Sequence, residues 1–167
     1  MRIAALAALG SLALSAQTIS TAQIELSGGT EKTLAQLWGA AAENPKSAAA
    51  RAEVSFAFLA LNRLQQAEWT ARESLALDPE NSRAHLLLGW TLAREYRYTA
   101  EALDSLHRAA RAYPEAHLAA ADVLEHQGSN AAARAEIEAY LATGATEHRK
   151  IAESWLKLLG SAPVVLK

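Results

Sequence analysis

Residues 82–114 read SRAHLLLGWTLAREYRYTAEALDSLHRAARAYP, two helix-forming runs rich in alanine and leucine that end at a proline. Proline also follows such runs earlier in the chain, so that Pro45, Pro79 and Pro114 are 34 and then 35 residues apart. Proline ends a helix because it disfavours the α conformation of the residue before it. This spacing is typical of a helix-turn-helix unit repeated in tandem, and such units stack into a solenoid whose usual work is binding.

Apolar and small side chains recur within residues 82–114 at the spacing of one helical face. We expect one helix from Ser82, as its cap, to about Tyr96 and a second from about Thr99 to Ala112. The residues predicted to face inward are Leu88, Gly89, Leu92, Ala102, Leu106 and Ala109. Glycine and alanine at these positions allow two helix backbones to approach closely.

The same reasoning predicts helices on both sides of this stretch, with no strand. Their expected ranges are about 30–44, 47–62, 65–77, 115–126, 130–142 and 146–159. Thr30 and Thr146 stand where the first and last of them begin, and Gly160 and Pro163 follow the last. Trp155 and Leu159 are expected to seal the open end of the array.

The composition fits one helical domain and excludes several classes of protein. The chain has 167 residues, of which 51% are hydrophobic but only 6% aromatic. The net charge of -2 is too small for a nucleic-acid or anionic-membrane surface. The absence of cysteine rules out disulfides, a lipoprotein anchor and cysteine-zinc sites.

The N-terminus has the pattern of a secretory signal. Arg2 precedes an uncharged apolar run from Ile3 to Leu14, which is too short to span a bilayer as a lone helix. Small residues at 20–22 favour cleavage before Gln23, with cleavage after Ala16 as a second possibility. We therefore predict an exported protein, periplasmic or extracellular, with no integral membrane segment after cleavage. The alternative is that this run is an N-terminal helix of the fold.

The repeated unit resembles the tetratricopeptide repeat. Leu88-Gly89, Ala102, Ala109-Ala110 and Pro114 match the family pattern, and Ala67, Ala71 and Leu75 match the second helix of the preceding unit. The resemblance is good over about residues 48–142. It implies an all-α, right-handed solenoid of about three helix pairs with a C-terminal capping helix. The expected parts are a signal peptide (1–22), a lead-in with a partial unit (23–46), repeats (47–79, 80–114 and 115–145), the capping helix (146–160) and a tail (161–167).

The family typically binds extended or helical peptides in a groove lined by the first helix of each unit. The resemblance therefore implies a protein or peptide partner. The candidate groove residues are Phe56, Leu59, Arg83, Trp90, Arg94, Asp122, Glu125 and His126. Trp90 lies next to Gly89 but off the inward-facing seam, so we expect an exposed binding anchor beside Arg94. The alternative is that Trp90 packs on the helix of the next unit.

One branch of the family grips a carboxylate terminus with lysine and asparagine. Ala52, Phe56 and Leu87 stand where those polar groups would be, which argues against that mode of recognition. Five histidines are scattered along the chain without recognised ligand spacing: His85, His107, His117, His126 and His148. We predict no catalytic residue, metal or cofactor. Self-association is the alternative function, and an enzyme is a third interpretation that no motif supports.

Overall fold

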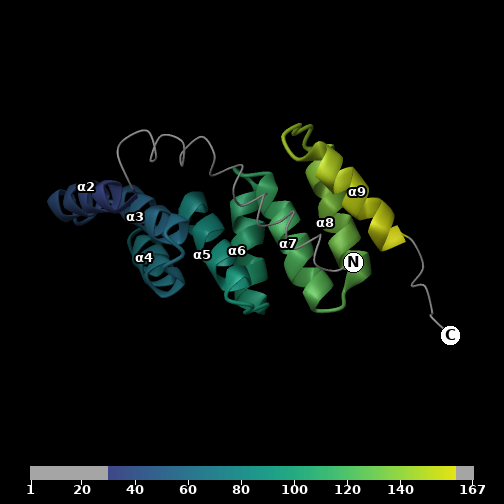
Figure 1. Ribbon diagram of the computed structural model, residues 1–167, viewed down its shortest axis with the longest axis horizontal. Coiled ribbons are helices and arrows are strands. Elements are labelled where there is room, and N and C mark those ends of the chain that lie inside the picture. Colours follow the sequence, from purple (N-terminus) through teal and green to yellow (C-terminus); the bar gives the residue numbers. More distant parts are fainter. Residues whose placement is uncertain (1–29, 161–167) are drawn as a thin grey trace.

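The computed structural model describes residues 30–160, and within them every regular element is an α-helix (Figure 1). The helices are α2 (Thr30–Glu43), α3 (Ala48–Ala60), α4 (Leu64–Leu77), α5 (Ser82–Arg94), α6 (Ala100–Ala110), α7 (Glu115–His126), α8 (Asn130–Ala142) and α9 (Arg149–Gly160). The predicted all-α class is confirmed.

The helices stack in a row, with α2 at one end and α9 at the other (Figure 1). Three hairpins form the body: α3 packs on α4, α5 on α6, and α7 on α8. The second helix of each hairpin also packs on the first helix of the next, and α5 contacts both α3 and α7 directly. The first helices therefore form one continuous layer, as in a solenoid of repeated units.

Small residues let the paired helices approach closely. Ala67, Ala71, Ala102 and Ala109 are fully buried. Gly89 lies so near α6 that a Cβ atom built on it would stand 2.5 Å from Leu106 Cγ. The prediction that small side chains form these seams is confirmed.

The three first helices end in the same kind of turn. Asn62, Tyr96 and Gly128 have left-handed φ angles of 57°, 58° and 76°. The following residue donates its backbone N–H to a carbonyl five residues earlier, Arg63 to Phe58, Arg97 to Leu92 and Ser129 to Leu124, at 2.9, 2.9 and 2.8 Å. This bond satisfies a carbonyl at the helix end. The equivalent turns fix the register of α3, α5 and α7 with offsets of 34 and then 32 residues.

Two predicted helix starts and three predicted ends are wrong by a few residues. Asn81 rather than Ser82 caps α5, because the Asn81 side chain accepts the N–H of Ala84 at 3.0 Å. The last helix begins at Arg149 and not at Thr146. The N–H of His148 donates to the Tyr140 hydroxyl at 3.1 Å, which ties the residues before α9 to α8. Helices α3, α5 and α6 end at Ala60, Arg94 and Ala110, each two residues before its predicted end at residue 62, 96 or 112.

The predicted signal peptide 1–22, the start of the lead-in and the tail 161–167 lie outside the described residues. Between residues 30 and 160, no helix has both the length and the apolar character needed to cross a membrane.

Candidate functional site

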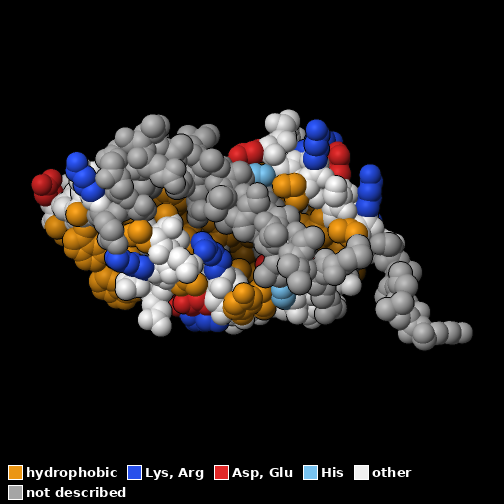
Figure 2. Space-filling view, viewed as in Figure 1, with side chains coloured by type: hydrophobic (Ala, Val, Ile, Leu, Met, Phe, Trp, Pro, Cys, Tyr) orange, Lys and Arg blue, Asp and Glu red, His pale blue; other side chains and the backbone are white. Residues whose placement is uncertain are grey.

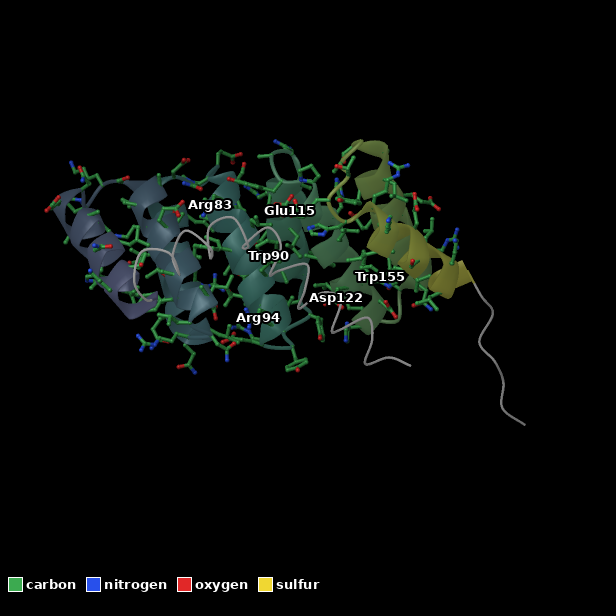
Figure 3. All side chains as sticks on the ribbon, turned by 45° about the horizontal axis from the view of Figure 1, so that its top comes forward. Arg83, Trp90, Arg94, Glu115, Asp122 and Trp155 are labelled. Carbon is green, nitrogen blue, oxygen red and sulfur yellow. The ribbon has the colours of Figure 1, made fainter. Side chains whose placement is uncertain are left out.

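The eight predicted groove residues all lie on the first helices of the three units. Phe56 and Leu59 belong to α3, the residues Arg83, Trp90 and Arg94 to α5, and the residues Asp122, Glu125 and His126 to α7. We call the surface made by α3, α5 and α7 the first-helix face. Figure 3 shows Arg83, Trp90 and Arg94 along α5, with Glu115 and Asp122 along the neighbouring α7.

The register of the turns shows which of these residues are equivalent. Phe56, Trp90 and Asp122 each lie six residues before the left-handed residue of their unit. Arg94 and His126 are equivalent in the same way, and so are Arg83 and Glu115. The position that is aromatic on α3 and α5 (Phe56 and Trp90) is therefore a carboxylate, Asp122, on α7.

The three apolar residues of the predicted groove, Phe56, Leu59 and Trp90, are buried. Trp90 is 8% exposed, Phe56 is 4% exposed and Leu59 is inaccessible, and all three belong to the main hydrophobic core. The prediction that Trp90 is an exposed anchor off the seam is wrong, because α5 packs against α3, α4, α6 and α7 and is buried almost all round. Trp90 is a core residue, as the alternative requires, in a cluster that includes residues of the next unit on α7. Whether any of the three contacts a partner stays a prediction.

Arg83 already has partners inside the chain. Its Nη2 donates to Glu53 Oε2 at 3.0 Å, and its guanidinium lies 5.2 Å from the centroid of the Phe56 ring. The ion pair and the cation–π contact hold this cation against α3.

Arg94 is different. Its Nη2 donates to Asn62 Oδ1 at 2.9 Å, and among residues 30–160 this neutral amide is its hydrogen-bond partner. The side chain is exposed to solvent, yet partial burial by its neighbours lowers the pKa of the guanidinium. Arg72 and Arg108 on the second helices each contact two carboxylates, from Glu68 and Glu101 and from Asp104 and Glu80. Arg94 can therefore still bind an anion, whereas Arg72 and Arg108 are already paired with carboxylates of the chain.

Burial disfavours the ionised form of two carboxylates of α7, Asp122 and Glu115. Burial raises the pKa of Asp122 to about 6, although the nearby His126 acts in the opposite direction. His126 Nδ1 lies 3.2 Å from Asp122 Oδ1, and the imidazole stacks on Tyr98 with ring centroids 4.2 Å apart. Burial also raises the pKa of Glu115. A charge kept where its ionised form is disfavoured is typical of a functional surface.

Glu125 binds a residue of the last helix, α9. The indole Nε1 of Trp155 donates to Glu125 Oε2 at 2.7 Å, and Trp155 is only 5% exposed. This bond joins α9 to α7, so Trp155 caps the array as predicted, while one oxygen of Glu125 is already occupied.

The structure adds two residues to the first-helix face, Asn62 and Glu115. Asn62 holds Arg94, and Glu115 occupies on α7 the position that Arg83 has on α5. The sequence carried a signal for both: Asn62 follows the end of one helix, and Glu115 directly follows the closing Pro114. Their equivalences depend on the turn register rather than on the proline spacing.

Two of the scattered histidines meet a shared carboxylate. His107 Nε2 lies 3.0 Å from Glu136 Oε1, and His117 Nδ1 lies 2.7 Å from Glu136 Oε2. These contacts join α6, α7 and α8 across the sequence. Within the described part of the chain, no group of three or more His, Asp or Glu side chains is arranged to hold a metal ion.

The raised pKa of Asp122 predicts a pH-dependent stability. Because the folded protein binds this proton more tightly than the unfolded chain, the free energy of unfolding falls as pH rises from about 4 to about 6. The variant Asp122→Asn lacks this loss. The free energy of unfolding of this variant should exceed that of the wild type by about 1–3 kcal/mol at pH 8 and differ little from it near pH 4.

Urea unfolding followed by circular dichroism at several pH values measures this difference. Asp104→Asn is the matched control, because Asp104 is an exposed carboxylate on the outer side of α6. An Asp122→Asn curve parallel to the wild type at all pH values would contradict the burial of this charge.

The likeness to known proteins is one of fold. No family model matches the chain, and no curated protein matches it either. Among solved structures, the chain is similar to MamA residues 41 to the end from Desulfovibrio magneticus RS-1, with 17% identity, a TM-score of 0.71 and coverage of 89% of this chain and 84% of that one. A second MamA crystal structure gives 16% identity, a TM-score of 0.69 and coverage of 90% and 81%. These neighbours are tetratricopeptide-like helical proteins, so the solenoid fold is shared.

Proposed function

We propose that this chain is a non-catalytic module that binds a protein or peptide segment on its first-helix face. The observation that carries the proposal is Arg94, a partly desolvated cation whose side-chain partner within residues 30–160 is a neutral amide. Asp122 lies on the next first helix with the opposite charge and is also desolvated. Such groups gain from a ligand that supplies the missing charge.

The fold supports the same proposal. Solenoids of this type expose a long face built from equivalent helices, and the tetratricopeptide-like neighbours share that architecture. Helices α3, α5 and α7 form one layer, so a segment lying across them would contact three units at once.

Differential capture tests this function. Tagged wild-type protein and the double variant Arg94→Glu/Asp122→Lys are used to capture proteins from cells that produce the chain, followed by quantitative mass spectrometry. We expect the partners of the wild type to be absent from the double variant and retained by Arg108→Glu, an outer-face control on α6. Equal sets of partners for all three proteins, or none for the wild type, would contradict the proposal.

Self-association is the second candidate, and an exposed aromatic cluster favours it. Trp38 and Trp69 are 38% and 52% exposed and stack with ring centroids 6.3 Å apart. Figure 2 shows hydrophobic side chains gathered at the end of the molecule where α2 and α4 lie. If this cluster joins two copies, sedimentation should depend on concentration for the wild type and not for Trp69→Ala. A monomer at every concentration would exclude it.

We further propose that the module acts after export, in the periplasm or outside the cell. The support is the uncharged run Ile3–Leu14 followed by small residues at 20–22. Mass spectrometry of the native protein should find Gln23 as its first residue. Recovery from the cytoplasm with Met1 retained would contradict this proposal.

A further inference from the structure

Helices α5 and α7 carry charges of opposite sign, the arginines Arg83 and Arg94 on α5 and the carboxylates Glu115, Asp122 and Glu125 on α7. The register of the turns pairs Arg83 with Glu115, Trp90 with Asp122, and Arg94 with His126. The first-helix face is therefore basic along α5 and acidic along the neighbouring α7. A charge that changes sign between two adjacent helices can select both the composition and the orientation of a bound segment.

Only some of these charges are free to act on a partner. Arg83 is paired with Glu53, and Glu125 accepts the indole N–H of Trp155. Arg94 is bonded to a neutral amide, and Asp122 faces His126 through Oδ1. Arg94 on α5 and Asp122 on α7 are thus two opposite charges whose contacts leave hydrogen-bonding capacity for a ligand.

We propose that the first-helix face binds an extended peptide segment that carries one acidic and one basic side chain, the acidic one on Arg94 and the basic one on Asp122. This inference rests on the proposed function and specifies its partner. The carboxylate of the segment completes the donor set of the Arg94 guanidinium, and its ammonium or guanidinium group pairs with the Asp122 carboxylate. Between these two contacts the segment crosses from α5 to α7.

The spacing of the helices sets the spacing of the two charges. Packed helices lie about 8–10 Å apart. An extended chain advances about 3.3 Å per residue. The acidic and basic residues of the segment should therefore be about two to four positions apart, because both long side chains add some reach. A segment with two charges of the same sign would place one of them against a like charge on the protein, which weakens its binding.

Selection from a display library of random linear peptides tests this inference without a known partner. The full chain is immobilised and the peptides that it enriches are sequenced. We expect them to share one acidic and one basic residue at the stated spacing. The selected peptides are then synthesised and their dissociation constants measured by calorimetry.

Variants assign each charge to its contact. Arg94→Gln and Asp122→Asn should each raise the dissociation constant about tenfold or more, whereas Arg108→Gln on the outer side of α6 should leave it unchanged. Arg94→Glu should abolish binding of the selected peptide and restore binding of a peptide in which the acidic residue is replaced by lysine. Circular dichroism confirms that each variant is folded, and this reciprocal rescue separates a contact from a loss of structure.

The outcomes distinguish a failure of the charge-pair specificity from a failure of peptide binding itself. Enriched peptides without the charge pair, or a dissociation constant unaffected by Arg94→Glu, would overturn this inference and leave peptide binding in place. No enrichment by the wild-type chain would overturn the proposed function itself.

Discussion

Replacing Gly89 with leucine should lower the free energy of unfolding by about 3 kcal/mol or more. Gly89 is buried on the side of α5 that faces α6. A single added Cβ would already stand 2.5 Å and 2.7 Å from Leu106 Cγ and Cδ2 and 3.2 Å from the carbonyl oxygen of Ala102. The backbone carbonyl cannot rotate away, so the two helices must separate. Even Gly89→Ala should destabilise the fold, although alanine favours a helix by about 1 kcal/mol over glycine.

Gly39 is the matched control. It lies within α2, and nothing stands within 4 Å of the Cβ that alanine would add. Gly39→Ala should therefore leave the free energy of unfolding unchanged or raise it by up to about 1 kcal/mol. Urea unfolding followed by circular dichroism measures both variants.

A double-mutant cycle tests the identity of the contact. Leu106→Ala alone should cost about 2–5 kcal/mol by leaving a cavity between α5 and α6. In the double variant Gly89→Ala/Leu106→Ala, the new methyl group occupies part of that cavity. The two costs should then be less than additive. Additive costs, or an unchanged stability of Gly89→Leu, would show that α5 and α6 do not meet at this seam.

The hairpins of the fold were predictable because three kinds of signal agreed. Pro79 follows the end of α4 by two residues, small residues lie on the seams, and leucines recur at helical spacing. The cap of α5 was predicted one residue too late because Asn81 and Ser82 are both good caps and stand side by side. The start of α9 depends on the bond from His148 to Tyr140 of another helix, which local sequence does not encode.

The candidate site was only partly predictable, because its register depends on the turns inside the units. The closing prolines suggest an offset of 35 residues between the second and third units, which would align Trp90 with Glu125. The left-handed residues Tyr96 and Gly128 give an offset of 32, which aligns Trp90 with Asp122. The change from Arg83 on α5 to Glu115 at the equivalent position of α7 becomes visible only with the second register.

The misjudged exposure of Trp90 has a different cause. A helix that packs on one neighbour shows a single apolar stripe, and residues off that stripe face water. Helix α5 packs on both flanking units as well as on α6, and the nine residues from Ala84 to Leu92 are all buried. The sequence HLLLGWTL at 85–92 is apolar nearly all round, which is the pattern of a central helix.

Trp90→Ala should consequently act on the fold before it acts on binding. The indole is 8% exposed and belongs to the core cluster that joins α3, α4, α5, α6 and α7. Its removal leaves a cavity in a layer that neighbouring units share, and we expect a loss of about 3–5 kcal/mol in the free energy of unfolding. Trp69→Ala is the matched control: Trp69 is 52% exposed, and its stacking on Trp38 accounts for a loss of about 0.5–1.5 kcal/mol. Denaturation curves of the two variants measure the difference in the free energy of unfolding.

If Trp90→Ala keeps the stability of the wild type and no longer binds the selected peptides, then Trp90 is a binding anchor and its burial in the core is wrong. If it is destabilised by the expected amount, Trp90 supports the layer on which Arg94 and Asp122 stand, and recognition rests on those two charges.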